Sequence, residues 1–114
     1  MIRIKRAYED AVDSDGFRVL VDRLWPRGVK KEDARIDLWM KEIAPSTELR
    51  EWFGHDPERW DEFRRRYRAE LADHKDDLKV LRDKAGEGSL TLIFAAKDVD
   101  RNNAVVLKEA LESM

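Results

Sequence analysis

Apolar and polar positions along this chain follow two periods, one typical of strands and one typical of helices. Residues 2–5 (IRIK) alternate apolar with charged side chains, which predicts a short strand with one wet face near a sheet edge. Residues 17–24 (FRVLVDRL) and 89–96 (SLTLIFAA) are apolar runs that predict buried strands. The second run is typical of a central parallel strand covered by helices on both faces.

A third apolar stretch, residues 36–43 (IDLWMKEI), is compatible with a strand or with a helical turn, because short apolar runs do not distinguish the two. Pro45 ends the stretch in either case. We favour a strand here, and we expect the charged residues 29–35 before it to form a loop.

Helical signals fill the middle of the chain. Ser46 is a good N-cap for a helix that reaches Phe53 and stops at Gly54. Asp56 followed by proline starts a second helix, and an aromatic and aliphatic stripe at spacings of three and four extends it to Leu71. This stripe consists of Trp60, Phe63, Tyr67 and Leu71.

The stripe lapses over residues 73–76 and resumes at Leu78 and Leu81, which predicts a separate helix. Asp98 or Asp100 is the predicted N-cap of a final helix. Strands interleaved with helices indicate one compact, layered α/β domain over residues 1–114, with a mostly parallel sheet of about four strands flanked by helices.

The amino-acid composition excludes several classes of function. The net charge of −2 is the small difference between 23 basic and 25 acidic residues, so no global field favours nucleic acid or an anionic membrane. There is no cysteine, which excludes disulfides and thiolate catalysis and fits a cytoplasmic location. We expect neither a signal peptide nor a membrane span. No metal is expected because two histidines give no ligand spacing, and no motif indicates a cofactor.

The segment VLVDRLWPRG, residues 19–28, points to a binding site. Its apolar half predicts a strand, and its polar half crowds the point where that strand ends. Ligands of open α/β sheets bind at the carboxyl ends of strands. If residues 17–24 and 89–96 are neighbouring parallel strands, their exits bring one set of polar side chains together. The set comprises Asp22, Arg23, Trp25, Arg27, Lys97, Asp98, Asn102 and Asn103.

Each residue type in this set has a role in binding a small anion. Arg23, Arg27 and Lys97 would hold a phosphate or carboxylate, helped by the N-terminus of the last helix. Asn102 and Asn103 would add amide hydrogen bonds, and Trp25 would stack on a ring. Asp22 or Asp98 is the acid/base candidate. The structural alternative is that Asp22 and Arg23 only form ion pairs across the strands.

Two other features have a functional and a structural interpretation. His55 beside Asp56 resembles a general base, but Asp56 is expected to cap a helix, so a solvent-facing loop histidine is favoured. The cluster Arg64, Arg65, Arg66 and Arg68 resembles a nucleic-acid surface. Acidic residues interleave with it at helical spacing, which favours a solvated face of paired charges.

VLVDRLWPRG, APSTELREWFGHDPERWDEFRRRYRAEL and LTLIFAAKD followed by NNAVVL together resemble the YeaO-like proteins of the domain of unknown function 488 family. The resemblance spans nearly the whole chain and implies a compact cytoplasmic α/β domain. The family has no established activity, so no reaction follows from it. Wider relatives often carry a cysteine and a Cys-His-Arg after the last strand. Here those places are occupied by residues 94–96 (FAA) and 101–103 (RNN), so no thiol-dependent role carries over.

Two hypotheses therefore stand. In the first, the chain binds a small anionic molecule bearing a phosphate or carboxylate, for example a nucleotide, at the strand exits, either as an enzyme or as a binding domain. In the second, it is a non-catalytic interaction or regulatory module whose arginine-bearing helix meets nucleic acid or a protein partner. Either a monomer or a homodimer is compatible with the sequence.

Overall fold

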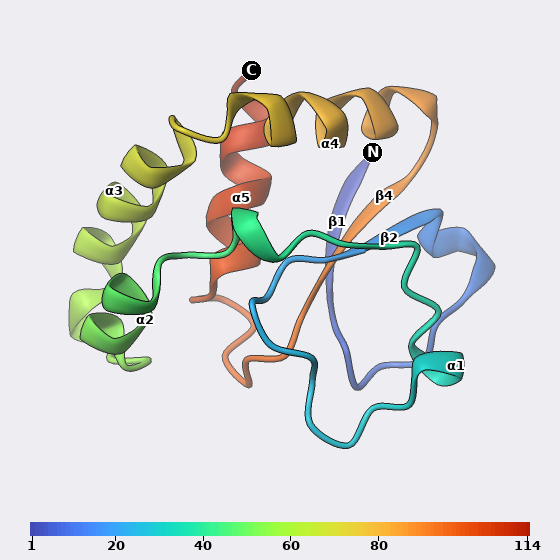
Figure 1. Cartoon of the computed structure of the whole chain (residues 1–114), viewed down its shortest axis with the longest axis horizontal. Helices are drawn as coiled ribbons and strands as arrows, with labels where there is room; N and C mark the ends of the chain where they lie inside the picture. Colours follow the sequence, from blue (N-terminus) through green and yellow to red (C-terminus); the bar gives the residue numbers. More distant parts are fainter.

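A four-stranded sheet with the order β1-β4-β2-β3 organises the computed structural model, which describes residues 1–114 (Figure 1). The strands are β1 (Ile2–Arg6), β2 (Phe17–Leu20), β3 (Leu38–Trp39) and β4 (Leu90–Phe94). Every neighbouring pair is parallel, so all four carboxyl ends lie at one edge. The predicted α/β class, the pairing of β2 with β4 and the edge position of β1 are confirmed.

The strands are shorter than the apolar runs that predicted them. β2 ends at Leu20 rather than at Leu24, although the Val21 N–H still donates to the Ile93 carbonyl at 3.1 Å. β4 is likewise trimmed at both ends of residues 89–96. The prediction of one strand over residues 36–43 was wrong in extent, because only two residues pair with β2 before a 3-10 turn at Lys41–Ile43.

Five α-helices complete the fold. They are α1 (Lys31–Ala34), α2 (Thr47–Phe53), α3 (Trp60–Leu71), α4 (Lys75–Glu87) and α5 (Asn103–Glu112). The short α1 lies where a loop was expected. Ser46 caps α2 by accepting from the Leu49 N–H at 3.2 Å, and Gly54 ends it with a φ of 53°.

Capping side chains also determine where the chain turns into α3 and α5. Asp56 accepts from the Glu58 N–H at 3.0 Å and begins a 3-10 turn that leads into α3. The predicted cap of α5 was wrong: Asn102, not Asp98 or Asp100, accepts from the Val105 N–H at 3.1 Å. The Asp98 carboxylate instead accepts N–H groups of the turn before the helix.

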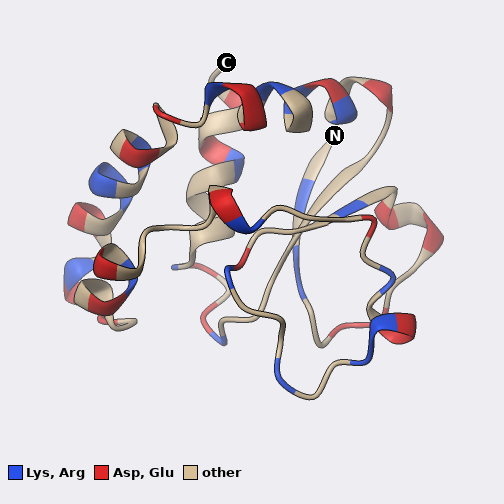
Figure 2. Cartoon of the chain, viewed as in Figure 1, with Lys and Arg blue, Asp and Glu red and all other residues tan.

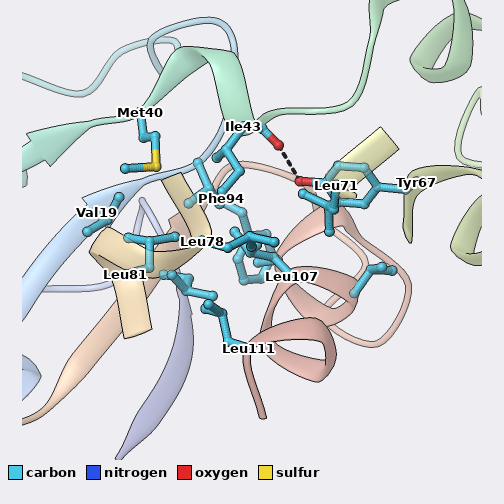
Figure 3. Packing of buried hydrophobic residues seen from close by; sticks show 14 of the residues in the cluster. Val19, Met40, Ile43, Tyr67, Leu71, Leu78, Leu81, Phe94, Leu107 and Leu111 are labelled. Carbon is cyan, nitrogen blue, oxygen red and sulfur yellow. Dashed lines mark hydrogen bonds between the residues drawn. The ribbon is translucent and has the colours of Figure 1, made fainter. Parts of the chain in front are cut away.

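The main core lies between one face of the sheet and α2 to α5. Val19, Leu92 and Phe94 point to this face, where they join the predicted stripe of α3. Tyr67 is fully buried in it, and its hydroxyl donates to the Ile43 carbonyl at 2.6 Å (Figure 3). Burial raises the pKa of Tyr67. The phenol therefore ties α3 to the segment that follows β3.

The opposite face of the sheet carries no long helix. Leu20 and Ile93 are buried there under the loop after β2, with Trp25 and Trp39 packed against them. The expectation that helices cover both faces of β4 was therefore wrong. Trp25 and Trp39, together with Val29 and Ile36, cover this face without a long helix.

A buried ion cluster lies on the same face, at the amino edge of the sheet. The Asp15 carboxylate accepts hydrogen bonds from Arg18 NH1 at 2.5 Å, from Lys5 Nζ at 3.2 Å and from the Val12 N–H at 3.1 Å. Burial raises the pKa of Asp15, but these hydrogen bonds outweigh burial and hold it below its ordinary value of 3.8. On the face of β1 that was expected to be wet, Arg3 is exposed, whereas Lys5 is partly buried because its ammonium contacts this carboxylate.

Charges on the helices are mixed in sign. Figure 2 shows Lys and Arg interspersed with Asp and Glu along α3 and α4. None of the helices is long and apolar enough to cross a lipid bilayer.

Candidate functional site

A surface cleft of about 790 Å³ opens at the carboxyl edge of the sheet, between the strand exits, α2, α3 and the start of α5. Its volume lies within the range of small-molecule sites. All eight residues that the sequence grouped at this edge line the cleft. The structure thus brings Arg27 and Lys97 to the same cavity, as predicted.

Asp22 joins the exits of the two central strands. Its Oδ2 accepts from the Ala95 N–H at 2.9 Å, and its Oδ1 accepts from Asn103 Nδ2 at 3.1 Å. Burial raises the pKa of the Asp22 carboxyl, and these hydrogen bonds partly oppose that rise, as do the charges of His55 and Arg50. Asp22 therefore fixes the spacing of the residues that follow β2 and β4.

Arg23 is the least satisfied polar side chain of the cleft. Its NH2 group donates to the Ala44 carbonyl at a long 3.4 Å, and its Nε is buried without any hydrogen-bond partner. A buried unpaired donor costs about 1–3 kcal/mol. Turning the Arg23 guanidinium toward an incoming anion would therefore break only one weak hydrogen bond.

The other basic side chains of the cleft are also free of carboxylates. Arg27, Arg50 and Lys97 are exposed, and none of them, nor Arg23, lies within 4.0 Å of an acidic oxygen as an ion pair. The alternative that Asp22 and Arg23 serve as structural ion pairs was therefore wrong. The carboxylate of Asp22 is satisfied by neutral N–H donors instead.

The start of α5 forms another wall. Asn103 Nδ2 also donates to the Val21 carbonyl at 3.0 Å, and Asn102 Nδ2 donates to the Asp98 carbonyl at 2.9 Å. Asp98 pairs with Arg101 at 3.4 Å. Its pKa is lowered by the hydrogen bond from the Asp100 N–H and then by the contacts with Arg101. Asp98 thus adds little uncompensated negative charge to the cleft.

Trp25 is a fixed part of the wall. Its Nε1 donates to the Val29 carbonyl at 2.7 Å, and its ring meets Trp39 edge-on at a centroid distance of 5.5 Å. A turn from Pro26 to Val29, with Gly28 at a φ of 79°, holds this segment in place. Both donor and ring position are therefore set before any ligand arrives.

Several residues that line the cleft were not predicted from the sequence. Arg50 and Phe53 come from α2, and His55 follows it with a φ of 56°. Their presence depends on how α2 packs on α3, where Glu70 accepts from Ser46 N at 2.8 Å and Ser46 Oγ at 2.6 Å. No local sequence signal reports that packing. His55 is exposed, as favoured, but it also borders the cleft.

The arginines of α3 lie outside the cleft, and their side chains contact other residues of the protein. Arg65 and Arg66 both pair with Glu62, and Arg64 pairs with Glu109 of α5. The paired charges predicted along this helix are present at Arg65 and Arg66, whereas Arg64 pairs with a different helix. No group of His, Asp and Glu side chains comes close enough to hold a metal ion.

The comparisons with known proteins agree on kinship. A family model described as the inactive DUF488-N3 subclade matches residues 1–114. The uncharacterized protein YeaO of Escherichia coli K12 is 50% identical over 113 residues, covering 99% of this chain and 98% of that protein. The uncharacterized protein Rv3073c of Mycobacterium tuberculosis H37Rv is 48% identical over 110 residues, covering 96% and 92%. No solved structure matches the chain. The chain therefore belongs to the DUF488 family, the family of domain of unknown function 488, in its N3 subclade.

Proposed function

We propose that this protein binds a small anionic molecule, bearing a phosphate or a carboxylate, in the cleft at the carboxyl edge of its sheet. One observation carries the proposal: Arg23 lines the cleft with its Nε buried and unpaired. A buried Nε without a partner lowers the stability of the free protein, and an anion that binds to Arg23 would recover that free energy.

Three further features support an anion as the ligand. Arg27, Arg50 and Lys97 add unpaired positive charge around the same cavity. The last helix begins at the cleft with Asn102 and Asn103, where free backbone N–H groups and the helix dipole favour negative charge. The cleft lies where open α/β sheets commonly bind ligands.

Binding, rather than a reaction, is the function we propose. Both carboxylates of the cleft, Asp22 and Asp98, accept backbone N–H groups, so each has a structural role that requires no reaction. The chain has no thiol, and the description of its subclade as inactive supports the same choice.

Inorganic phosphate is a suitable first probe, measured by the shift of the thermal unfolding midpoint and by calorimetric titration. Phosphate also stabilises proteins without a specific site, because it is excluded from their surfaces. The decisive comparison is therefore between two double variants with equal charge. Arg27→Gln with Lys97→Gln removes cleft cations, whereas Arg68→Gln with Lys79→Gln removes exposed cations of α3 and α4.

We expect phosphate to raise the midpoint of the wild type and of the α3/α4 variant more than chloride does at equal ionic strength. The cleft variant should lose that excess, since only ligand bound to the native state contributes it. Equal shifts in the three proteins, or a calorimetric titration without heat of binding to the wild type, would overturn the proposal.

A further inference from the structure

The cleft has a larger excess of positive charge than a single negative charge would balance. Four cationic side chains line it, namely Arg23, Arg27, Arg50 and Lys97. Of its two carboxylates, Asp98 is already paired with Arg101, which leaves Asp22 to offset one cation. A monoanion would leave two of these cations without a counter-charge. A phosphate monoester carries close to two negative charges above its second pKa of about 6, and it matches this excess better.

The same cleft also exposes apolar surface. Leu24 is 64% exposed and Tyr8 is 48% exposed, and both line the cavity. The Tyr8 hydroxyl donates to the Arg27 carbonyl at 3.1 Å, so its ring is held beside a basic residue. The rings of Trp25 and Phe53 lie in the same lining. Inorganic phosphate alone would leave this apolar surface in contact with water.

We infer that the ligand is a phosphate monoester carried on an aromatic or similarly flat apolar group. The inference rests on the proposed function and narrows it in two ways. The doubly charged phosphate would lie among the guanidinium and ammonium groups, and the apolar group would cover Leu24, Tyr8 and Trp25. Apolar area removed from water and charge neutralisation then act on different parts of one molecule.

Three probes separate the two parts in calorimetric titrations at pH 8 and low ionic strength. Phenyl phosphate is a dianion with a ring, phenyl sulfate has nearly the same shape with one negative charge, and inorganic phosphate has the charge without the ring. We expect phenyl phosphate to bind about tenfold more tightly than inorganic phosphate. We expect it to bind at least about fivefold more tightly than phenyl sulfate, with a difference that shrinks as salt is added.

A pair of variants tests the placement of the ring. Leu24→Ser removes exposed apolar surface in the cleft, and Val80→Ser removes it from α4, where Val80 is 43% exposed. Leu24→Ser should weaken phenyl phosphate about threefold or more and leave inorganic phosphate unchanged, whereas Val80→Ser should change neither.

Each failure has a distinct meaning. If none of the three probes binds, the proposed function fails together with this inference. If phenyl sulfate binds as tightly as phenyl phosphate, the preference for a dianion is wrong while anion binding stands. If inorganic phosphate equals phenyl phosphate, or if Leu24→Ser has no effect on phenyl phosphate, the apolar group is wrong.

Discussion

Replacing Arg23 and Arg18 by methionine should change stability by very different amounts, although the two residues lie only five positions apart. Methionine keeps most of the apolar stem and removes the guanidinium. Arg18 is buried, its Nε donates to the Ala34 carbonyl at 3.0 Å, and its NH1 contacts Asp15 at 2.5 Å. Arg23 has one long contact and an unpaired Nε.

The magnitudes follow from these partners. Arg18→Met leaves the Asp15 carboxylate with less counter-charge in a buried place, which costs about 3–5 kcal/mol. For a domain of this size, about 4 °C of unfolding midpoint corresponds to 1 kcal/mol, so the midpoint should fall by about 12–20 °C. Arg23→Met relieves a desolvation cost of about 1–3 kcal/mol and loses a weak hydrogen bond. We expect a protein within about 1 kcal/mol of the wild type, or more stable.

Urea unfolding of the three proteins without added phosphate, followed by circular dichroism, gives the free energies directly. The phosphate titration then shows whether Arg23→Met loses binding while it keeps stability. If Arg23→Met were destabilised by 2 kcal/mol or more, Arg23 would be a structural residue, and the interpretation of its unpaired Nε would be refuted.

Three further predictions concern stability. Asp15→Asn should cost about 3–5 kcal/mol near neutral pH, whereas Asp13→Asn, at a carboxylate that is 98% exposed, should cost less than about 0.5 kcal/mol. Because the pKa of Asp15 is lowered on folding, its stabilisation is present above the ordinary value of 3.8 and is lost as the pH falls through the folded-state pKa; urea unfolding from pH 7 to pH 3 checks this, and a pH-independent difference would contradict it. Gly16→Ala should destabilise strongly, since Gly16 has a φ of 68° and a new Cβ would lie 2.2 Å from the Ser89 carbonyl oxygen; Gly86→Ala, within α4 and with open space around it, should be neutral or gain up to about 1 kcal/mol, and thermal unfolding that ranks the pair the other way would refute the argument. Tyr67→Phe should cost about 1–2 kcal/mol in urea unfolding, because it leaves the Ile43 carbonyl unpaired; a loss below about 0.5 kcal/mol would show that this carbonyl finds another partner.

Much of the fold was predictable because its signals are local. Each of these signals determines an element within a few residues of the chain. They are the apolar runs of β2 and β4, the caps Ser46 and Asp56, and the stripe of α3. The grouping of polar side chains at the strand exits followed from one topological assumption, that β2 and β4 are parallel neighbours, and that pairing is present.

The remaining features depend on contacts between distant segments. Asp15 lies in a turn whose composition indicates an exposed loop, yet it is buried because Lys5 and Arg18 reach it from two strands. Arg50 and His55 border the cleft only because α2 is fastened to α3. The loop after β2 covers a sheet face for which a helix was expected, and no period along the chain reports that two tryptophans can do so.

The direction of α5 has a practical consequence for handling the protein. The helix starts at the cleft and runs away from it, so the C-terminus lies toward the edge where β1 begins, and Figure 1 shows both chain ends on that side. An affinity tag, a fluorophore or a sensor-chip tether attached to either end would leave the mouth of the cavity open to solution. Immobilised protein should therefore report the same affinities as protein free in solution.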